Sequence, residues 1–227
     1  MREWNAETYH RVSDPMVELG IPVLARLPLN GDELVLDVGT GTGRLTEKLL
    51  ERLPRGRAVA IDLSTNMLAV AHDYLRRRFA HHVAFVLADA AALPINGRAH
   101  AIFSTATFHW VLDHDALFRS LFVALKPGGR LVAQCGGGRN IERMHARFKT
   151  LMREPRFSPF FAGWNGPWNF ADAETTARRL ATAGFVDIRT NVEYAPVRQP
   201  DTCPVPSASW PVRCRTPSHR SARALRR

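Results

Sequence analysis

Short apolar runs and longer helical periodicities alternate along most of the chain. The short runs favour β-branched residues and are bounded by turn residues, as is typical of strands buried on both faces of a parallel sheet. Predicted strands cover residues 34–38, 58–61, 83–87, 99–104, 130–135 and 185–197. Predicted helices, with apolar residues three or four apart, cover residues 16–27, 45–53, 66–79, 115–125, 140–152 and 173–183. This order predicts an α/β fold with a doubly wound, mostly parallel sheet flanked by helices.

Proline and glycine mark where these elements begin, bend or end. Pro15 suits the first position of the helix before the first strand, and Gly20 and Pro22 predict a kink or a break inside it. Further along, Lys126-Pro127-Gly128-Gly129 is expected to end the helix over 115–125 and to turn the chain into the next strand.

The first predicted strand runs directly into a glycine turn, in the sequence LVLDVGTGTGRL from Leu34 to Leu45. Gly39, Gly41 and Gly43 can take positive φ and admit a ligand close to the backbone, and the next helix presents free N–H groups. The dinucleotide pattern G-x-G-x-x-G does not fit in either register, because Arg44 or Thr46 stands in the third glycine position. The alternative is a tight connection without a ligand, or a turn from another nucleotide-binding α/β protein.

An acidic residue precedes these glycines, and the resulting Asp37-x-Gly39-x-Gly41-x-Gly43 resembles motif I of the class I S-adenosylmethionine-dependent methyltransferases. The resemblance implies a Rossmann-like fold and S-adenosyl-L-methionine as cofactor. It also implies that Asp37 holds the ammonium group of the methionine moiety, directly or through water. A carboxylate suits a cation better than a pyrophosphate.

Two further motifs follow in the order of that family. Asp62 ends the second predicted strand and can accept the ribose hydroxyls, and Leu63 to Leu68 resembles the D-x-S-x-x-M-L stretch. The resemblance implies that Leu63 and Met67 line the adenine pocket. The alternative is a capped helix with Met67 in the core.

Ala88-Asp89-Ala90, before Leu93-Pro94, resembles the family pattern G-D-A-x-x-L-P. It implies that Asp89 accepts from the adenine amino group and that the Ala90 N–H donates to the ring; Asp89 as a simple turn residue is the alternative. Residues 105–110 leave the carboxyl end of the fourth strand, which faces the ligand crevice in a doubly wound sheet. Thr105 is therefore predicted to contact the cofactor.

The block from Thr107 to His114 resembles stretches of trans-aconitate and malonyl-carrier-protein carboxyl methyltransferases. His109 is the candidate general base for an acceptor that must lose a proton; a pocket wall or core histidine is the alternative. Arg11 and Arg139 could pair with an anionic substrate or remain solvated. The predicted substrate-binding residues are Tyr9, Phe108, Trp110 and Trp164.

Together these motifs predict methyl transfer from S-adenosylmethionine to a small molecule, with O-methylation of a carboxylate or hydroxyl favoured. The in-line displacement needs positioning but no metal and no covalent nucleophile. One alternative is a cofactor-binding domain with impaired or no turnover, because no seventh strand is evident. The other is a nucleic-acid methyltransferase, disfavoured because no N-P-P-Y-type motif is present.

The predicted methyltransferase domain covers residues 1–197. Residues 1–30 form a cap over the cofactor, with Trp4 and Tyr9 either in the cap or on the sheet edge, and residues 153–171 form an aromatic lid segment. Residues 198–227 are rich in proline, serine and arginine and predict a disordered basic tail. A frameshifted or truncated C-terminus is one hypothesis for this change of composition, and a basic partner-binding arm is the other.

Composition changes this picture little. The chain has 227 residues, 45% of them hydrophobic, which suffices for one core. The net charge of +10 is uneven, because residues 198–227 hold seven arginines against Asp201. Three cysteines without metal-ligand spacing predict neither a disulfide framework nor a zinc site. Without an evident leader or apolar span, we expect a cytoplasmic monomer or homodimer acting on a small molecule, with no nucleic acid or membrane partner.

Overall fold

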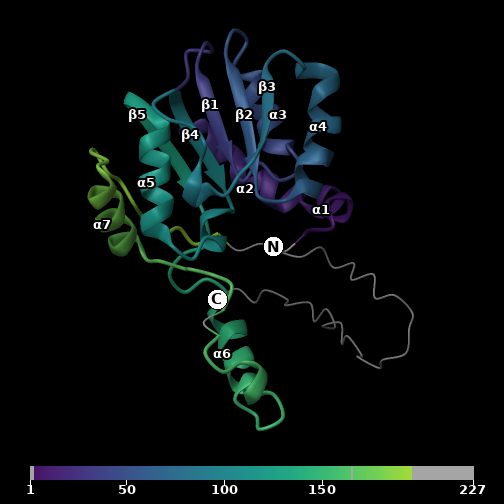
Figure 1. Cartoon of the computed structure of the whole chain (residues 1–227), viewed down its shortest axis with the longest axis vertical. Helices are drawn as coiled ribbons and strands as arrows, with labels where there is room; N and C mark the ends of the chain where they lie inside the picture. The colour runs from purple at the N-terminus through teal and green to yellow at the C-terminus, as the bar shows by residue number, and fades with distance from the viewer. Residues whose placement is uncertain (1–2, 165, 196–227) are drawn as a thin grey trace, which may run out of the picture. The chain divides into compact units, whose positions relative to one another are not determined.

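The computed structural model describes residues 3–164 and 166–195. Within them, five parallel strands form one sheet in the order β3-β2-β1-β4-β5 (Figure 1). The strands are β1 (Leu34–Val38), β2 (Arg57–Asp62), β3 (Val83–Leu87), β4 (Ala99–Thr105) and β5 (Leu125–Gln134). The helices are α1 (Ala6–Val12), α2 (Asp14–Ala25), α3 (Arg44–Glu51), α4 (Thr65–Phe79), α5 (His114–Ala124), α6 (Glu142–Met152) and α7 (Ala173–Ala183), with short 3₁₀ turns η1 (Ala90–Ala92), η2 (Phe108–Trp110) and η3 (Ser158–Phe160).

Helices cover both faces of the sheet, as the uninterrupted apolar strands require. Neighbouring residues of β1 point to opposite faces: Val35 joins the core cluster that includes residues of α2, α3 and α4, and Leu36 joins the cluster that includes residues of α5. Leu180 of α7 packs against the second cluster. Figure 1 shows α5 and α7 together on one side of the domain and α4 on the other. The doubly wound α/β prediction is confirmed.

The break expected inside the helix before β1 does not occur. α2 continues through Gly20 and Pro22 to Ala25, and Pro15 lies in its first turn as predicted. Gly20 is explained by packing: a Cβ at this position would lie 2.2 Å from Cδ1 of Leu45. The glycine lets α2 approach α3 closely instead of ending the helix.

The turn expected at Lys126–Gly129 lies inside β5. Leu125 pairs with Ala99 and Arg130 with Ala101, so four residues bulge out between two ladder positions. α5 ends at Ala124 because the next residue is already extended and paired with β4. The bulge makes the strand irregular without separating it from the helix by a loop.

The strand predicted over 185–197 is wrong for the residues described. The structure has no strand from 185 to 195, and residues 196 and 197 lie outside the described residues. Val186 is 82% exposed and Tyr194 93% exposed. A strand forms only where a neighbour accepts and donates its backbone hydrogen bonds, and no described strand pairs with this segment.

α6 and the aromatic segment after it lie apart from the sheet (Figure 1). α6 begins at Glu142, two residues after the predicted start, and buries none of its residues. η3 is the only helical turn described between α6 and α7. Among the helices of the described residues, none combines the length and apolar content needed to span a bilayer.

Candidate functional site

The glycine turn joins β1 to α3, and its three glycines have positive φ: 79° at Gly39, 55° at Gly41 and 83° at Gly43. The N–H of Gly39 donates to the Ile61 carbonyl at 2.8 Å, which ties the turn to β2. A Cβ on Gly39 would lie 2.0 Å from Oγ1 of Thr107, and one on Gly43 would lie 2.9 Å from Leu75. Gly39 and Gly43 are therefore required by packing inside the protein.

Gly41 differs from the other two glycines. Among the described residues, the only atom within 4 Å of a Cβ placed there is Cε1 of Tyr9, at 3.9 Å. The turn and the N-terminal helices enclose a cavity of about 50 Å³ at this point. Five residues predicted from the sequence line it: Tyr9, Asp37, Gly39, Gly41 and Thr105. Tyr9, predicted to contact the substrate, thus lines this cavity beside Gly41.

Asp37 places a buried carboxylate in the wall of this cavity. Its Oδ2 accepts hydrogen bonds from the hydroxyls of Thr46 at 2.6 Å and Thr40 at 3.3 Å. Its Oδ1 has no hydrogen-bond partner in the described part of the chain, where no fully buried side-chain oxygen or nitrogen is left unpaired, so Oδ1 keeps some contact with solvent although the residue is only 3% exposed. Burial raises the pKa of Asp37 to about 6, against the two hydroxyl bonds that lower it. Asp37 is held by one oxygen and offers the other.

Asp62 ends β2 beside the same turn. Its Oδ2 accepts from the Gly41 N–H at 2.8 Å, and its Oδ1 accepts from the Ser64 N–H at 2.9 Å. Each oxygen keeps a second lone pair for a further donor. Burial raises the pKa of this carboxyl above its usual range.

The residues after Asp62 have features of both interpretations of their motif, a helix cap with Met67 in the core and an apolar residue open to a ligand. Ser64 caps α4 by accepting from the Met67 N–H at 3.2 Å, and the Met67 side chain is buried. Leu63 is 43% exposed and is free to contact a ligand.

Asp89 lies one strand further, after β3. Its Oδ1 accepts from the Ala91 N–H at 2.9 Å and so caps η1, while Ala90 packs into the core. Asp62 pairs in register with Leu87, two residues before Asp89, and Val38 pairs with Ile61. The three carboxylates of Asp37, Asp62 and Asp89 therefore follow the carboxyl edge of three neighbouring strands.

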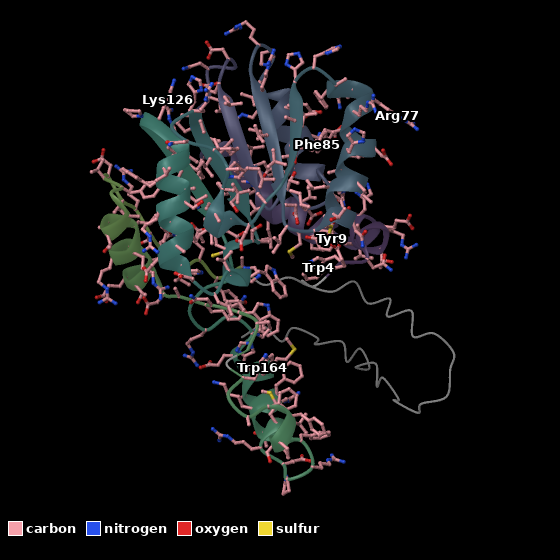
Figure 2. The ribbon with its side chains drawn as sticks, viewed as in Figure 1. Trp4, Tyr9, Arg77, Phe85, Lys126 and Trp164 are labelled. Carbon is pink, nitrogen blue, oxygen red and sulfur yellow. The ribbon has the colours of Figure 1, made fainter. Side chains whose placement is uncertain are left out.

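The N-terminal segment is held over this edge by polar contacts that the sequence motifs did not reveal. Nδ1 of His10 lies 2.9 Å from Oγ1 of Thr42 in the glycine turn. A carboxylate oxygen of Glu3 accepts from the Ser64 hydroxyl at 2.7 Å. Figure 2 shows Trp4 and Tyr9 at this end of the sheet, with Tyr9 in α1 and Trp4 just before it in the chain. The signal in the sequence was limited to the aromatic residues Trp4 and Tyr9.

An aromatic cluster follows β4 and extends the site beyond the cavity. It consists of Trp4, His109, Trp110, His145, Trp168 and Phe170. The His109 ring stacks on Phe170 with centroids 5.6 Å apart, and Trp110 contacts both Trp4 and Trp168. Nδ1 of His109 accepts from the Gly136 N–H at 3.2 Å. Burial lowers the pKa of His109 to about 4.

Two predicted substrate residues do not join this cluster. Phe108 is 3% exposed and packs edge-on against Phe118 in the core, because the 3₁₀ turn directs it inward. Trp164 is 50% exposed and contacts Phe161 on the segment after α6, apart from Trp4 and Tyr9 (Figure 2). Both residues therefore lie outside the aromatic cluster, and their contact with the substrate stays a prediction.

The structure brings Trp168, Phe170 and His145 to the cluster instead. The first two belong to the aromatic segment that the sequence had singled out, although their partners could not be read from it. Arg139 is engaged by Glu142 at 2.6 Å on an exposed surface, and Arg11 is exposed. Neither arginine makes a described contact with the cluster.

Comparisons with known proteins agree with this geometry. The profile of a family described as "Methyltransferase domain" matches residues 35–129. Trans-aconitate 2-methyltransferase of Variovorax paradoxus (strain S110) is 33% identical over 189 residues, covering 83% of this chain and 68% of the relative. The enzyme of that name from Paracidovorax citrulli (strain AAC00-1) is 33% identical, covering 82% and 66%. The chain thus spans about two thirds of the length of these relatives.

A shorter match and two solved structures complete the comparison. Malonyl-[acyl-carrier protein] O-methyltransferase of Marinomonas sp. (strain MWYL1) is 43% identical over 111 residues, covering 48% of this chain and 40% of that protein. The methyltransferase bound to the Haloferax volcanii Trm112 activator superposes with a TM-score of 0.65 at 19% identity, covering 81% and 77% of the two chains. Haemonchus contortus phosphoethanolamine N-methyltransferase 2, bound to S-adenosylhomocysteine, superposes with a TM-score of 0.60 at 21% sequence identity. The match covers 75% of this chain and 37% of that chain. At these identities the structures establish the shared fold.

Proposed function

The chain belongs to the S-adenosylmethionine-dependent methyltransferases, and from this premise we propose that it methylates an oxygen of a small molecule, a carboxylate or a hydroxyl. The observation that carries the proposal is the row of carboxylates from Asp37 through Asp62 to Asp89, beside the open Gly41. Neighbouring strands lie about 4.8 Å apart. Such a row can contact an elongated ligand along its whole length.

The residues fit the polar groups of the cofactor in order. Oδ1 of Asp37 is unpaired and would accept from the ammonium group. The free lone pairs of Asp62 would accept the ribose hydroxyls, and the second oxygen of Asp89 would accept from the adenine amino group. Leu63 would contact the adenine ring.

When bound, S-adenosylmethionine supplies a methyl group carried by a sulfonium sulfur. An oxygen nucleophile attacks the methyl carbon in line, and the sulfur leaves with the electron pair of the broken bond. The protein has to bring that oxygen to the methyl group and exclude water. Thr105 ends β4 at the cavity, and the aromatic cluster lies beyond it around His109 and Trp110. We assign the cofactor to the row of carboxylates and the acceptor to the aromatic cluster.

Calorimetric titration with S-adenosylmethionine and S-adenosylhomocysteine tests the cofactor site. We expect the wild type to bind both ligands. Asp62→Ala should weaken binding at least tenfold, because it removes the carboxylate that accepts hydrogen bonds from the ribose hydroxyls. Asp89→Ala is a second variant with little risk to folding, because Asp89 is exposed. Asp73→Ala is the matched control, because its side chain is 88% exposed on the outer surface of α4. A folded wild type that binds neither ligand would refute the proposal.

An acceptor screen tests the second half of the proposal. Because relatives are named trans-aconitate and malonyl-carrier-protein methyltransferases, the screen begins with small carboxylic acids and continues with alcohols and phenols. Transfer of a labelled methyl group to one of these classes is expected. Cofactor binding without transfer to any of them would support a binding domain without turnover.

A further inference from the structure

His109 is held in a single neutral tautomer by the backbone. The Gly136 N–H points at Nδ1 from 3.2 Å, and a backbone amide can only donate. Nδ1 must therefore carry a lone pair, and the hydrogen of the neutral ring must be on Nε2. The role of each ring nitrogen is thus fixed by a donor that cannot be reversed.

The surroundings keep this geometry in place. The ring is stacked on Phe170 at 5.6 Å and lies 5.4 Å from Trp110. Gly136 is required for the approach, because a Cβ there would lie 2.8 Å from the Phe170 ring and 2.3 Å from Asn140. The Asn169 N–H also donates to the His109 carbonyl at 2.8 Å, which joins the aromatic segment to η2.

Nε2 remains available to a ligand. It has no partner in the described residues, and no buried side-chain nitrogen there is without one, so Nε2 is in contact with solvent. His109 follows Thr105 and Ala106, which line the cavity below the glycine turn. The open N–H therefore belongs to the acceptor side of the site.

We propose that His109 binds the methyl acceptor as a fixed hydrogen-bond donor from Nε2 to an acceptor oxygen, and that it is not the general base. This inference rests on the proposed methyl transfer. To accept a proton at Nε2 the neutral ring would first have to move its hydrogen to Nδ1, which would break the bond from Gly136. Protonation at Nδ1 would break the same bond.

The chemistry is balanced without a base when the acceptor is an ionised carboxylate. Its oxygen forms the new bond to the methyl carbon, the bond from that carbon to sulfur breaks, and its electron pair stays on sulfur. No proton moves in this step. Burial and the nearby His114 both lower the pKa of His109, so the ring is neutral at physiological pH.

Paired substitutions separate a donor from a base. In His109→Gln the side-chain amide nitrogen can take the place of Nε2 as a donor, but the amide group cannot act as a general base. In His109→Asn the shorter side chain places its amide only where Nδ1 stands. We expect His109→Gln to keep kcat/KM within about tenfold of the wild type. His109→Asn should raise KM for the acceptor more than tenfold, because a hydrogen bond to a charged group is lost. His81→Gln, at an exposed imidazole outside the aromatic cluster and the cavity, should change neither parameter, and all variants should keep the wild-type dependence of kcat/KM on pH.

The opposite pattern would overturn the proposal: equal loss of kcat in both His109 variants together with loss of one limb of the pH profile. A second measurement does not depend on turnover. Nitrogen NMR of histidine-labelled protein should show His109 protonated at Nε2 and unprotonated at Nδ1 at pH 7, and a proton on Nδ1 would refute the assignment. Calorimetry on the same variants keeps the two hypotheses apart, because only failure of the proposed function abolishes cofactor binding in the wild type.

Discussion

At the scale of single residues, the glycine turn shows two different uses of positive φ. Gly39 combines a φ of 79° with a neighbour 2.0 Å from its missing Cβ, whereas Gly128, at 75°, has no atom within 4 Å of that position. Left-handed backbone costs an L-residue about 1–2 kcal/mol, and overpacking costs a further 1–3 kcal/mol or so. Gly128→Ala should therefore cost about 1–2 kcal/mol and Gly39→Ala about 2–5 kcal/mol in free energy of unfolding. Urea denaturation measures both, and equal losses would show that Thr107 moves aside freely.

Asp37 predicts a pH dependence of stability. Its folded pKa of about 6 exceeds the unfolded value of about 3.9, so folding favours the protonated carboxyl. The contribution is fully present below pH 4, is lost as pH rises through 6, and amounts to at most about 3 kcal/mol. Asp37→Asn should remove this trend and be at least as stable as the wild type at pH 7. Denaturation curves from pH 4 to 8 test the trend, and parallel curves for the two proteins would contradict it.

The same carboxyl predicts how cofactor binding responds to pH. Only ionised Asp37 attracts an ammonium group, so the affinity for S-adenosylmethionine should rise between pH 5 and 7 and then level off. Asp37→Asn should bind more weakly at pH 7 and lose this dependence. Titration calorimetry at several pH values measures both effects. An unchanged pH dependence in the variant would place the ammonium group elsewhere.

At the scale of elements, we predict that the N-terminal cap expected over residues 1–30 moves when the cofactor enters. The cavity beneath it measures about 50 Å³, well below the roughly 300 Å³ that small-molecule sites usually reach. The cap is tied to the turn by His10 and Thr42. We expect the amides of α1 to exchange with solvent faster than those of β1, and bound cofactor to slow them. Thr42→Val, which removes the tie, should accelerate exchange in α1 alone. No effect of the cofactor on α1 would show that the ligand enters by another route.

The sequence predicted those elements whose signal is local. Each of the strands β1 to β5 was predicted at least in part, because each contains a short run of apolar residues that can be recognised locally. The segment over 185–195 has a similar composition but forms no strand, because pairing depends on a neighbour in space. In the same way, positive φ at Gly41 follows from the motif, while the Gly136 bond to His109 joins segments 27 residues apart in the chain. Side-chain partners in the aromatic cluster depend on the fold and could not be read from the sequence.

At the scale of the whole molecule, the candidate functional residues lie along one edge of the sheet. Parallel strands all end at the same side, so carboxylates that lie far apart in the sequence become neighbours at the ends of β1, β2 and β3. β4 pairs with β1 on the side away from β2, so His109, which follows β4, comes from the other half of the sheet. A fold with this connectivity therefore needs few motif residues to build a cofactor site.

The division of the chain yields the last prediction. Both core clusters of the described residues draw on positions 23–185, and the compact unit that contains them ends at Ala195. Residues 196–227 carry +6 of the net charge of +10. A chain of residues 1–195 should therefore keep the melting temperature and cofactor affinity of the full chain. It should lose any non-specific binding to RNA, which in the full chain should fall steeply with salt because it arises from the arginines.

Fluorescence anisotropy with a random RNA at several salt concentrations measures the RNA binding of both chains, and calorimetry on the same samples measures cofactor binding. Loss of cofactor binding would show that the domain extends beyond residue 195, and RNA binding by the shorter chain would support the nucleic-acid methyltransferase alternative.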